Sequence, residues 1–87
     1  MLANVRINSL NELIELLLNI KSREEMKDFL LGILTPKELG EIPTRLQIVK
    51  RLKKGMAQHK IAEDLKVGIA TVTRGSKEIQ MGRFKVV

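Results

Sequence analysis

The chain has 87 residues, a formal net charge of +6 and no cysteine, which suits one small domain without disulfide bonds or a thiolate metal site. Its single histidine cannot form a metal site or a catalytic triad alone. No apolar run approaches the ~20 residues that span a bilayer, and no signal-peptide pattern is present, so a cytoplasmic protein without a membrane partner is expected.

The positive charge is concentrated in the second part of the chain. Residues 1–35 hold 4 Lys/Arg and 5 Asp/Glu, whereas residues 36–87 hold 12 Lys/Arg and 5 Asp/Glu. A basic surface of this kind is typical of proteins that bind phosphate groups, and it favours double-stranded DNA as a partner. On charge alone, a solvated surface that keeps the protein soluble explains the pattern equally well.

The first helical pattern is unusually apolar. Residues 1–8 show no periodicity and predict a frayed start, whereas Ser9 and Glu12 form a capping box that predicts a helix beginning at Ser9. Apolar residues then cover more of residues 10–20 than one buried stripe needs. Either a core helix or packing on a second subunit explains this excess, and the small chain favours the second subunit. The polar face lacks Lys and Arg, which argues against a membrane-surface helix.

Two more start signals follow. Ser22 begins a capping box that predicts a helix extending to Leu34. Thr35 is a suitable cap for the next helix, with Pro36 at its first helical position.

This third helix meets a proline. Pro43 lacks an N–H and crowds the preceding turn, so a kink or short break is expected at residues 40–43 and a firm helix over residues 44–54. The predicted buried stripe, with Ile48 at its edge, consists of Leu46, Val49 and Leu52. The basic residues of the last two turns, which could also contact phosphates, are Lys50, Arg51, Lys53 and Lys54. Gly55 is expected to end the helix.

Residues 58–76 are interpreted as a helix-turn-helix motif. The apolar residues of its first helix lie three or four positions apart and share one face: Ile61, Ala62 and Leu65. Residues 66–68 form the turn, where Val67 can fill the gap between the helices. Lys66 is at a position that favours φ > 0, which costs a non-glycine residue roughly 1 kcal/mol.

The second helix of the motif starts near Ile69 and turns Val72 inward. Its outward residues are short and uncharged until an arginine follows: Ile69, Ala70, Thr71, Thr73 and Arg74. Such side chains suit a helix that enters the roughly 12 Å major groove. A plain helical hairpin is the alternative, but the outward residues and the basic surroundings favour DNA binding.

The second helix of the motif ends at Gly82 at the latest, and residues 83–87 are either disordered or fold back so that Phe84 packs on the core. With no repeat or linker, the sequence predicts one all-α domain over residues 1–87 with about five helices. Residues 9–34 are assigned to dimerisation, and residues 58–79 to the DNA-binding helix-turn-helix.

The region from Leu34 to Ile79 resembles the Trp repressor family. The matching segments are L-T-P at residues 34–36, T-R-L-Q-I-V at 44–49, Gly55, Gln58 and G-I-A-T-V-T-R-G-S at 68–76. The last segment is specific, because nine successive residues match the turn and recognition helix of the family. The resemblance implies a repressor that is an intertwined helical homodimer and binds a palindromic operator through its two recognition helices.

The resemblance also implies which residues bind DNA. These are Gln58, His59, Lys60, Gly68, Ile69, Ala70, Thr71, Thr73, Arg74, Ser76 and Lys77. Threonine hydroxyls can bond to bases, phosphates or bridging waters, and the Ile and Ala side chains can contact thymine methyl groups.

A ligand site is implied as well. In the family, two arginines hold L-tryptophan as co-repressor, and they correspond here to Arg45 and Arg74, with Gly75 allowing close approach of the backbone. One guanidinium can bind a carboxylate while the other stacks on an indole. Glu78 replaces the serine that meets the ligand's amino group, which leaves L-tryptophan or another small amino acid as the expected effector. The family's last helix is missing or reduced to residues 83–87. Alternatively, both arginines contact phosphates or form ion pairs within the chain.

Two functions are compatible with these features. The first is a sequence-specific, DNA-binding transcriptional regulator of the repressor type, acting as a homodimer. The alternative is a protein-interaction module that uses the Leu-rich N-terminal helices and has an incidental basic surface. An enzyme is not expected, because the sequence has no nucleophile–base pair, metal cluster or phosphate-binding glycine loop.

Overall fold

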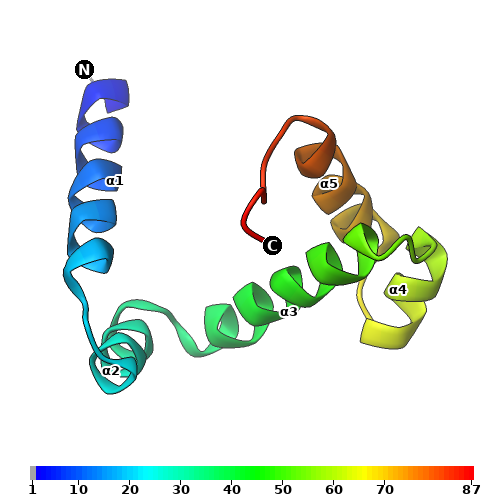
Figure 1. Ribbon diagram of the computed structural model, residues 1–87, viewed down its shortest axis with the longest axis horizontal. Coiled ribbons are helices and arrows are strands. Elements are labelled where there is room, and N and C mark those ends of the chain that lie inside the picture. The colour runs from blue at the N-terminus through cyan, green and yellow to red at the C-terminus, as the bar shows by residue number, and fades with distance from the viewer. Residues whose placement is uncertain (1) are drawn as a thin grey trace. The chain divides into compact units, whose positions relative to one another are not determined.

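The computed structural model describes residues 2–87, which form helices and no strands. The helices are α1 (Leu2–Asn19), α2 (Arg23–Ile33), α3 (Pro36–Lys53), α4 (Gln58–Leu65) and α5 (Ile69–Gln80) (Figure 1). The all-α fold class predicted from the sequence is therefore confirmed for this part of the chain. The contacts divide it into two compact units, the first ending at Thr35 and the second running from Pro36 to Val87.

Helix α1 begins earlier than its capping box predicted. It includes Leu2, so Ser9 lies inside the helix and the prediction that Ser9 caps it is wrong. Residues 2–8 contain neither glycine nor proline, and nothing in their composition stops the helix from extending toward the N-terminus. The predicted frayed start is therefore wrong from Leu2 onward, and residue 1 lies outside the described residues.

Helix α2 begins as predicted. Ser22 has an extended backbone, and its Oγ accepts a hydrogen bond of 3.0 Å from the N–H of Glu25. This side-chain cap satisfies one of the N–H groups that a helix start leaves without a backbone partner.

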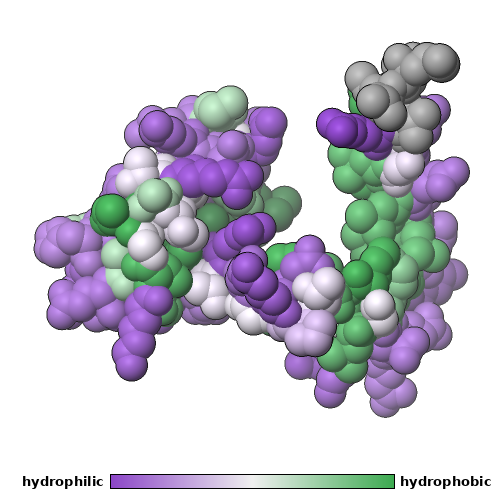
Figure 2. Space-filling view, turned by 180° about the vertical axis from the view of Figure 1, so that it is seen from behind, coloured by the Kyte–Doolittle hydropathy of each residue, from purple (hydrophilic) through white to green (hydrophobic). Residues whose placement is uncertain are grey.

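The apolar side chains of α1 and α2 remain largely uncovered. From residue 6 to residue 35, none of the described side chains is buried. The exposed large apolar residues here are Ile7, Leu10, Ile14, Leu16, Leu18, Leu30, Leu31 and Ile33. Figure 2 shows hydrophobic residues gathered along α1. An exposed apolar surface of this kind is typical of a site that packs on another protein surface.

Helix α3 continues through its proline. Pro43 lies inside the helix, so of the two expectations for residues 40–43 the short break is wrong, whereas the kink stays a prediction. Proline removes one backbone donor, but the turns on either side keep their own hydrogen bonds. The Oγ1 of Thr44, directly after the proline, donates a bond of 2.8 Å to the carbonyl oxygen of Gly40, four residues earlier.

Two helices are followed by residues with positive φ angles. At the end of α3, Gly55 has φ 84°, and the N–H of Met56 bonds to the carbonyl of Arg51 at 3.1 Å, which confirms the predicted stop. At the end of α4, Lys66 has φ 55°, and the N–H of Val67 bonds to the carbonyl of Ala62 at 3.1 Å. The expected left-handed backbone at Lys66 is therefore confirmed.

The core of the second unit lies where α3, α4 and α5 meet. Ile48, Ile61 and Val72 are at most 1% exposed. The partly buried residues packed around them are Leu52, Met56, Ala62, Leu65 and Val67. The inward positions predicted for Val72 and Val67 are confirmed.

The predicted stripe on α3 was wrong at two positions. Ile48 is in the core rather than at its edge, whereas Leu46 is 46% exposed. Two residues correspond to about 200° around an α-helix, so Leu46 and Ile48 cannot face the same neighbours. Helices α4 and α5 cover the side that carries Ile48.

Within residues 2–87, no helix has both the length and the apolar character that crossing a membrane requires.

Candidate nucleic-acid interface and ligand pocket

Helices α4 and α5 form the helix-turn-helix, joined by residues 66–68. Ile61 from α4 and Val72 from α5 are fully buried in the shared core. The Oγ1 of Thr73 donates a hydrogen bond of 2.8 Å to Oε1 of Gln58, linking α5 to the first residue of α4. Apolar packing and one polar bond therefore hold the two helices against each other.

The residues assigned to DNA binding differ in exposure. The exposed members are His59, Lys60, Gly68, Ile69, Ala70, Thr71, Arg74 and Lys77. Gln58, Thr73 and Ser76 are half-buried, and the first two bond to each other. Lys60 lies 3.4 Å from Asp64 one turn further along α4. The exposed side chains at the start of α5 are thus short and leave room for close approach by another surface.

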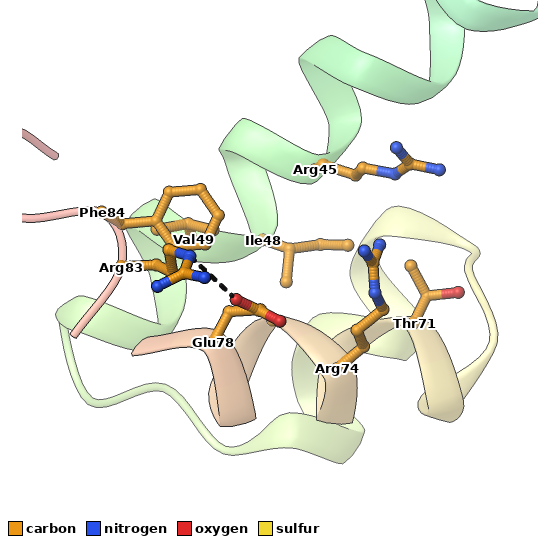
Figure 3. A pocket seen from close by; sticks show the side chains of 9 residues that line it. Arg45, Ile48, Val49, Thr71, Arg74, Glu78, Arg83 and Phe84 are labelled. Carbon is orange, nitrogen blue, oxygen red and sulfur yellow. Dashed lines mark ion pairs between the residues drawn. The ribbon is translucent and has the colours of Figure 1, made fainter. Parts of the chain in front are cut away.

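A pocket of about 400 Å³ lies between α3, α5 and the segment that follows α5 (Figure 3). Its lining residues are Arg45, Ile48, Val49, Thr71, Arg74, Gly75, Glu78, Arg83 and Phe84. All the residues that the family resemblance assigned to an effector site lie around this pocket. Its apolar lining comes from Ile48, Val49 and Phe84.

The charged groups lie at two ends of the pocket. Figure 3 shows Arg45 and Arg74 near Thr71 at one end, with Glu78 and Arg83 at the other. Arg45 lies 3.8 Å from Glu41 on the preceding turn of α3. Arg74 has neither an ion-pair nor a hydrogen-bond partner among residues 2–87. The Nε of Arg83 lies 3.5 Å from Oε2 of Glu78.

Gly75 on α5 faces the side chains of α3. A Cβ atom at this position would lie 3.4 Å from both Cγ2 of Ile48 and Cδ1 of Leu52. A larger side chain here would push the helices apart or enter the pocket. The space between the two helices beside the pocket therefore has room for a methyl group at ordinary contact distance and for nothing larger on this side of α5.

The segment after α5 turns back toward α3. Gly82 has φ 94°, and the N–H of Arg83 bonds to the carbonyl oxygen of Glu78 at 2.9 Å. The ammonium group of Lys53 then donates to the carbonyl oxygens of Phe84 and, at 3.2 Å, of Val87. These bonds attach the segment to α3 and bring Phe84 to the pocket wall, one of the two arrangements considered for residues 83–87.

Comparison with known proteins shows which family the chain belongs to. A family model described as Trp repressor protein matches residues 8–85, most of the chain. The chain belongs to the Trp repressor family. Members of the Trp repressor family are transcription regulators rather than enzymes.

Similar proteins come from several bacteria. The Trp operon repressor homolog of Vibrio vulnificus strain YJ016 is 43% identical over 60 residues, which are 67% of this chain and 59% of that protein. The homolog of Actinobacillus succinogenes is 38% identical over 72 residues, 82% of this chain and 71% of that protein. The homolog of Photobacterium profundum is 41% identical over 66 residues, 74% of this chain and 64% of that protein. The chain thus matches only about three-fifths of the length of the Vibrio relative.

Several lining residues of the pocket were absent from the effector site that the sequence predicted, although Thr71 was assigned to DNA binding. Ile48 and Val49 lie three and four positions after Arg45, and Thr71 lies three positions before Arg74. This spacing puts each group on one helical face, so the sequence carried a signal for these residues. Arg83 and Phe84 follow the turn at Gly82 and lie outside any helical period, so the sequence carried no comparable signal for them.

Metal binding has no support in the residues that the structure describes. Among residues 2–87, no three His, Cys, Asp or Glu side chains gather as a metal ion would require.

Proposed function

We propose that this Trp repressor family member is a sequence-specific, DNA-binding transcriptional repressor that acts as a homodimer. The observation that carries the proposal is the exposed start of α5, where Ile69, Ala70 and Thr71 project from a helix-turn-helix. Their short side chains suit insertion into the major groove, where base edges present their distinguishing groups. In this proposal, the DNA-binding residues are those that the family resemblance assigned.

Phosphate contacts supply much of the affinity in the proposed complex. Lys54 is exposed directly after α3, and Lys60 and Lys77 are exposed on α4 and α5. Lysines beside a recognition helix bind phosphates and position the protein without selecting bases. The concentration of Lys and Arg in residues 36–87 supports this division of roles.

A second copy of the chain is the proposed partner of the first unit. The exposed apolar residues of α1 and α2 need another apolar surface to pack against, and the same surface of a second copy provides one. A two-fold dimer also presents two recognition helices, which matches a palindromic operator with half-sites about one helical turn apart.

The pocket is the proposed site of an effector. Arg74 has no partner within residues 2–87 and borders the pocket together with Arg45, so a small carboxylate can bridge the two guanidinium groups. The relatives are named as repressors of the Trp operon, which makes L-tryptophan the first ligand to test. A ligand between α3 and α5 would fix the angle of the recognition helix.

Selection of bound duplexes from a random pool, with and without L-tryptophan, tests this function. The proposal predicts enrichment of one palindromic sequence, and an effector would make the enrichment depend on the ligand. A pool that stays random at low salt in both arms would contradict DNA-sequence recognition.

The exposed apolar surface of α1 and α2 also favours a second candidate function, a protein-interaction module. In this case the chain would remain monomeric at high concentration and leave the duplex pool unchanged. Dimerisation together with enrichment would exclude it.

A further inference from the structure

One side-chain hydrogen bond joins the two helices of the helix-turn-helix within residues 2–87. The Oγ1 of Thr73 on α5 donates to Oε1 of Gln58, the first residue of α4, at 2.8 Å. Both side chains are half-buried, next to the core that contains Ile61 and Val72. Apolar packing already holds the helices together there, so the local consequence of this bond is the orientation of the Gln58 amide.

The bond uses the only hydrogen that the Thr73 side chain can donate. A threonine hydroxyl has one O–H, so it cannot donate to Gln58 and to a base or phosphate at the same time. Thr71 differs in both respects, because it is exposed and its hydroxyl has no hydrogen-bond partner within the described residues. Of the two threonines, Thr71 is therefore the one that is free to contact a base.

The amide of Gln58 keeps its donor end free. Its Oε1 accepts from Thr73, whereas its Nε2 has no hydrogen-bond partner among residues 2–87. Phosphate oxygens only accept hydrogen bonds, so a glutamine that contacts DNA phosphates must present Nε2 rather than Oε1. The bond from Thr73 favours this orientation, because the opposite one would place the amide oxygen against phosphate oxygens.

The surroundings of this amide favour phosphates over bases. Lys60 is exposed two residues after Gln58 on α4. Lys77 is exposed one turn after Thr73 on α5, on the same helical face. In a DNA-bound helix-turn-helix the first helix crosses the backbone while the second enters the groove, and Gln58 belongs to the first.

We propose that Thr73 is a positioning residue that acts through Gln58. Its hydroxyl orients the Gln58 amide so that Nε2 donates to a DNA phosphate, and Thr73 itself reads no base. This gives Thr73 a narrower role than the DNA contact that the family resemblance assigned. The inference rests on the proposed function only in that the helix-turn-helix binds DNA.

A double-mutant cycle on the full chain tests the proposal. Thr73→Val keeps the shape of the side chain and removes its donor, and Gln58→Ala removes the amide. We expect each substitution to weaken binding about tenfold, as the loss of a hydrogen bond to a charged group does. The loss should be equal for the selected palindromic duplex and a scrambled duplex. The double variant should bind no more weakly than Gln58→Ala, because without the amide Thr73 has nothing to orient.

Two conservative substitutions separate positioning from a structural role. Thr73→Ser keeps the hydroxyl and should retain nearly the affinity of the unaltered chain. Gln58→Glu keeps an acceptor for Thr73 but replaces the donor with a negative charge, so it should weaken binding to both duplexes more than Gln58→Ala does.

The salt dependence gives an independent measurement. Neither Thr73→Val nor Gln58→Ala removes a charge, so the slope of affinity against salt concentration should stay unchanged. A distorted motif would also lose contacts of Lys60 or Lys77 with phosphates, and its slope would fall. A lower slope in Thr73→Val would therefore contradict the proposal.

The outcomes separate the inference from the proposed function. Losses that multiply in the double variant would show that Thr73 contacts DNA independently of Gln58, and a changed duplex preference in Thr73→Val would show that it reads a base. Either result, or unaltered affinity in Thr73→Val, would overturn the inference while leaving DNA binding in place. If the unaltered chain binds no duplex at low salt, the proposed function itself is wrong.

Discussion

At the residue scale, Thr71 and Lys54 separate base recognition from phosphate binding. Thr71 is exposed at the start of the recognition helix, so Thr71→Ala should change which duplex is preferred. Lys54 is exposed directly after α3, and Lys54→Ala should weaken binding to all duplexes and reduce the salt slope by about one unit. Lys53 is a poorer probe, because it also holds the segment after α5.

Fluorescence anisotropy with the selected duplex and a scrambled duplex, over a series of salt concentrations, measures both effects. Equal losses on the two duplexes for both substitutions would show that Thr71 does not select bases.

Arg45 and Arg74 should differ in their effect on ligand control. Arg45→Ala should abolish the coupling between ligand and DNA, about 1–3 kcal/mol, while sparing DNA affinity without ligand. Arg74→Ala should damage both, because this side chain lies on the recognition helix. The measurement is DNA affinity with and without the small carboxylate that binds best. Unchanged coupling in Arg45→Ala would exclude the bridging role.

The sequence predicted some of the pocket residues that lie on helices. Arg45, Arg74, Gly75 and Glu78 were assigned through the family resemblance, and the spacing of their neighbours would have added Thr71. Arg83 could not be assigned, because its place depends on the turn at Gly82 and on the bond from its N–H to Glu78.

At the element scale, the turn between α4 and α5 contains one residue with a strained backbone conformation. Lys66 has φ 55°, which glycine adopts without steric penalty. Lys66→Gly should therefore stabilise the fold by about 0.5–1 kcal/mol, despite the greater freedom of glycine in the unfolded chain. Urea denaturation followed by circular dichroism measures the change.

Glu63→Gly is the matched control for this turn. Glu63 is exposed inside α4, where glycine should cost about 1 kcal/mol. If both substitutions destabilised the protein equally, strain at Lys66 would not be the explanation.

The helix boundaries show what local sequence signals can predict. Ser22 and Pro36 correctly predicted where two helices start. The Ser22 side chain accepts a hydrogen bond from an N–H of the first turn, and Pro36 stands at a position where no backbone donor is needed. Ser9 failed because the residues before it are also compatible with a helix. The stripe on α3 failed at Leu46 and Ile48 because periodicity identifies faces, whereas the choice between them depends on where α4 and α5 pack.

At the scale of the whole molecule, the uncovered surface of α1 predicts a dimer. Light scattering at micromolar concentration should give about twice the 9.9 kDa chain mass. Leu10→Glu puts a charge on the apolar side of α1, where Leu10 is 55% exposed, and should shift the mass toward the monomer. A clean monomer of the unaltered chain at high concentration would contradict the dimer.

Asn8→Glu is the control for the dimer prediction. It adds the same charge two residues earlier, about 200° around the helix, on the polar side. This variant should remain dimeric, and loss of the dimer in both variants would point to charge rather than to apolar packing.

Sequence-specific DNA binding is the central claim, and the ratio of two affinities tests it most directly. The measurement is equilibrium binding of the full chain to the selected palindromic duplex and to a scrambled duplex of equal composition, at one salt concentration and with the effector present. We predict a preference of at least about 10³ for the selected duplex, as is typical of specific complexes. Affinities within a few-fold of each other would contradict the claim and leave only nonspecific attraction between a basic surface and phosphates.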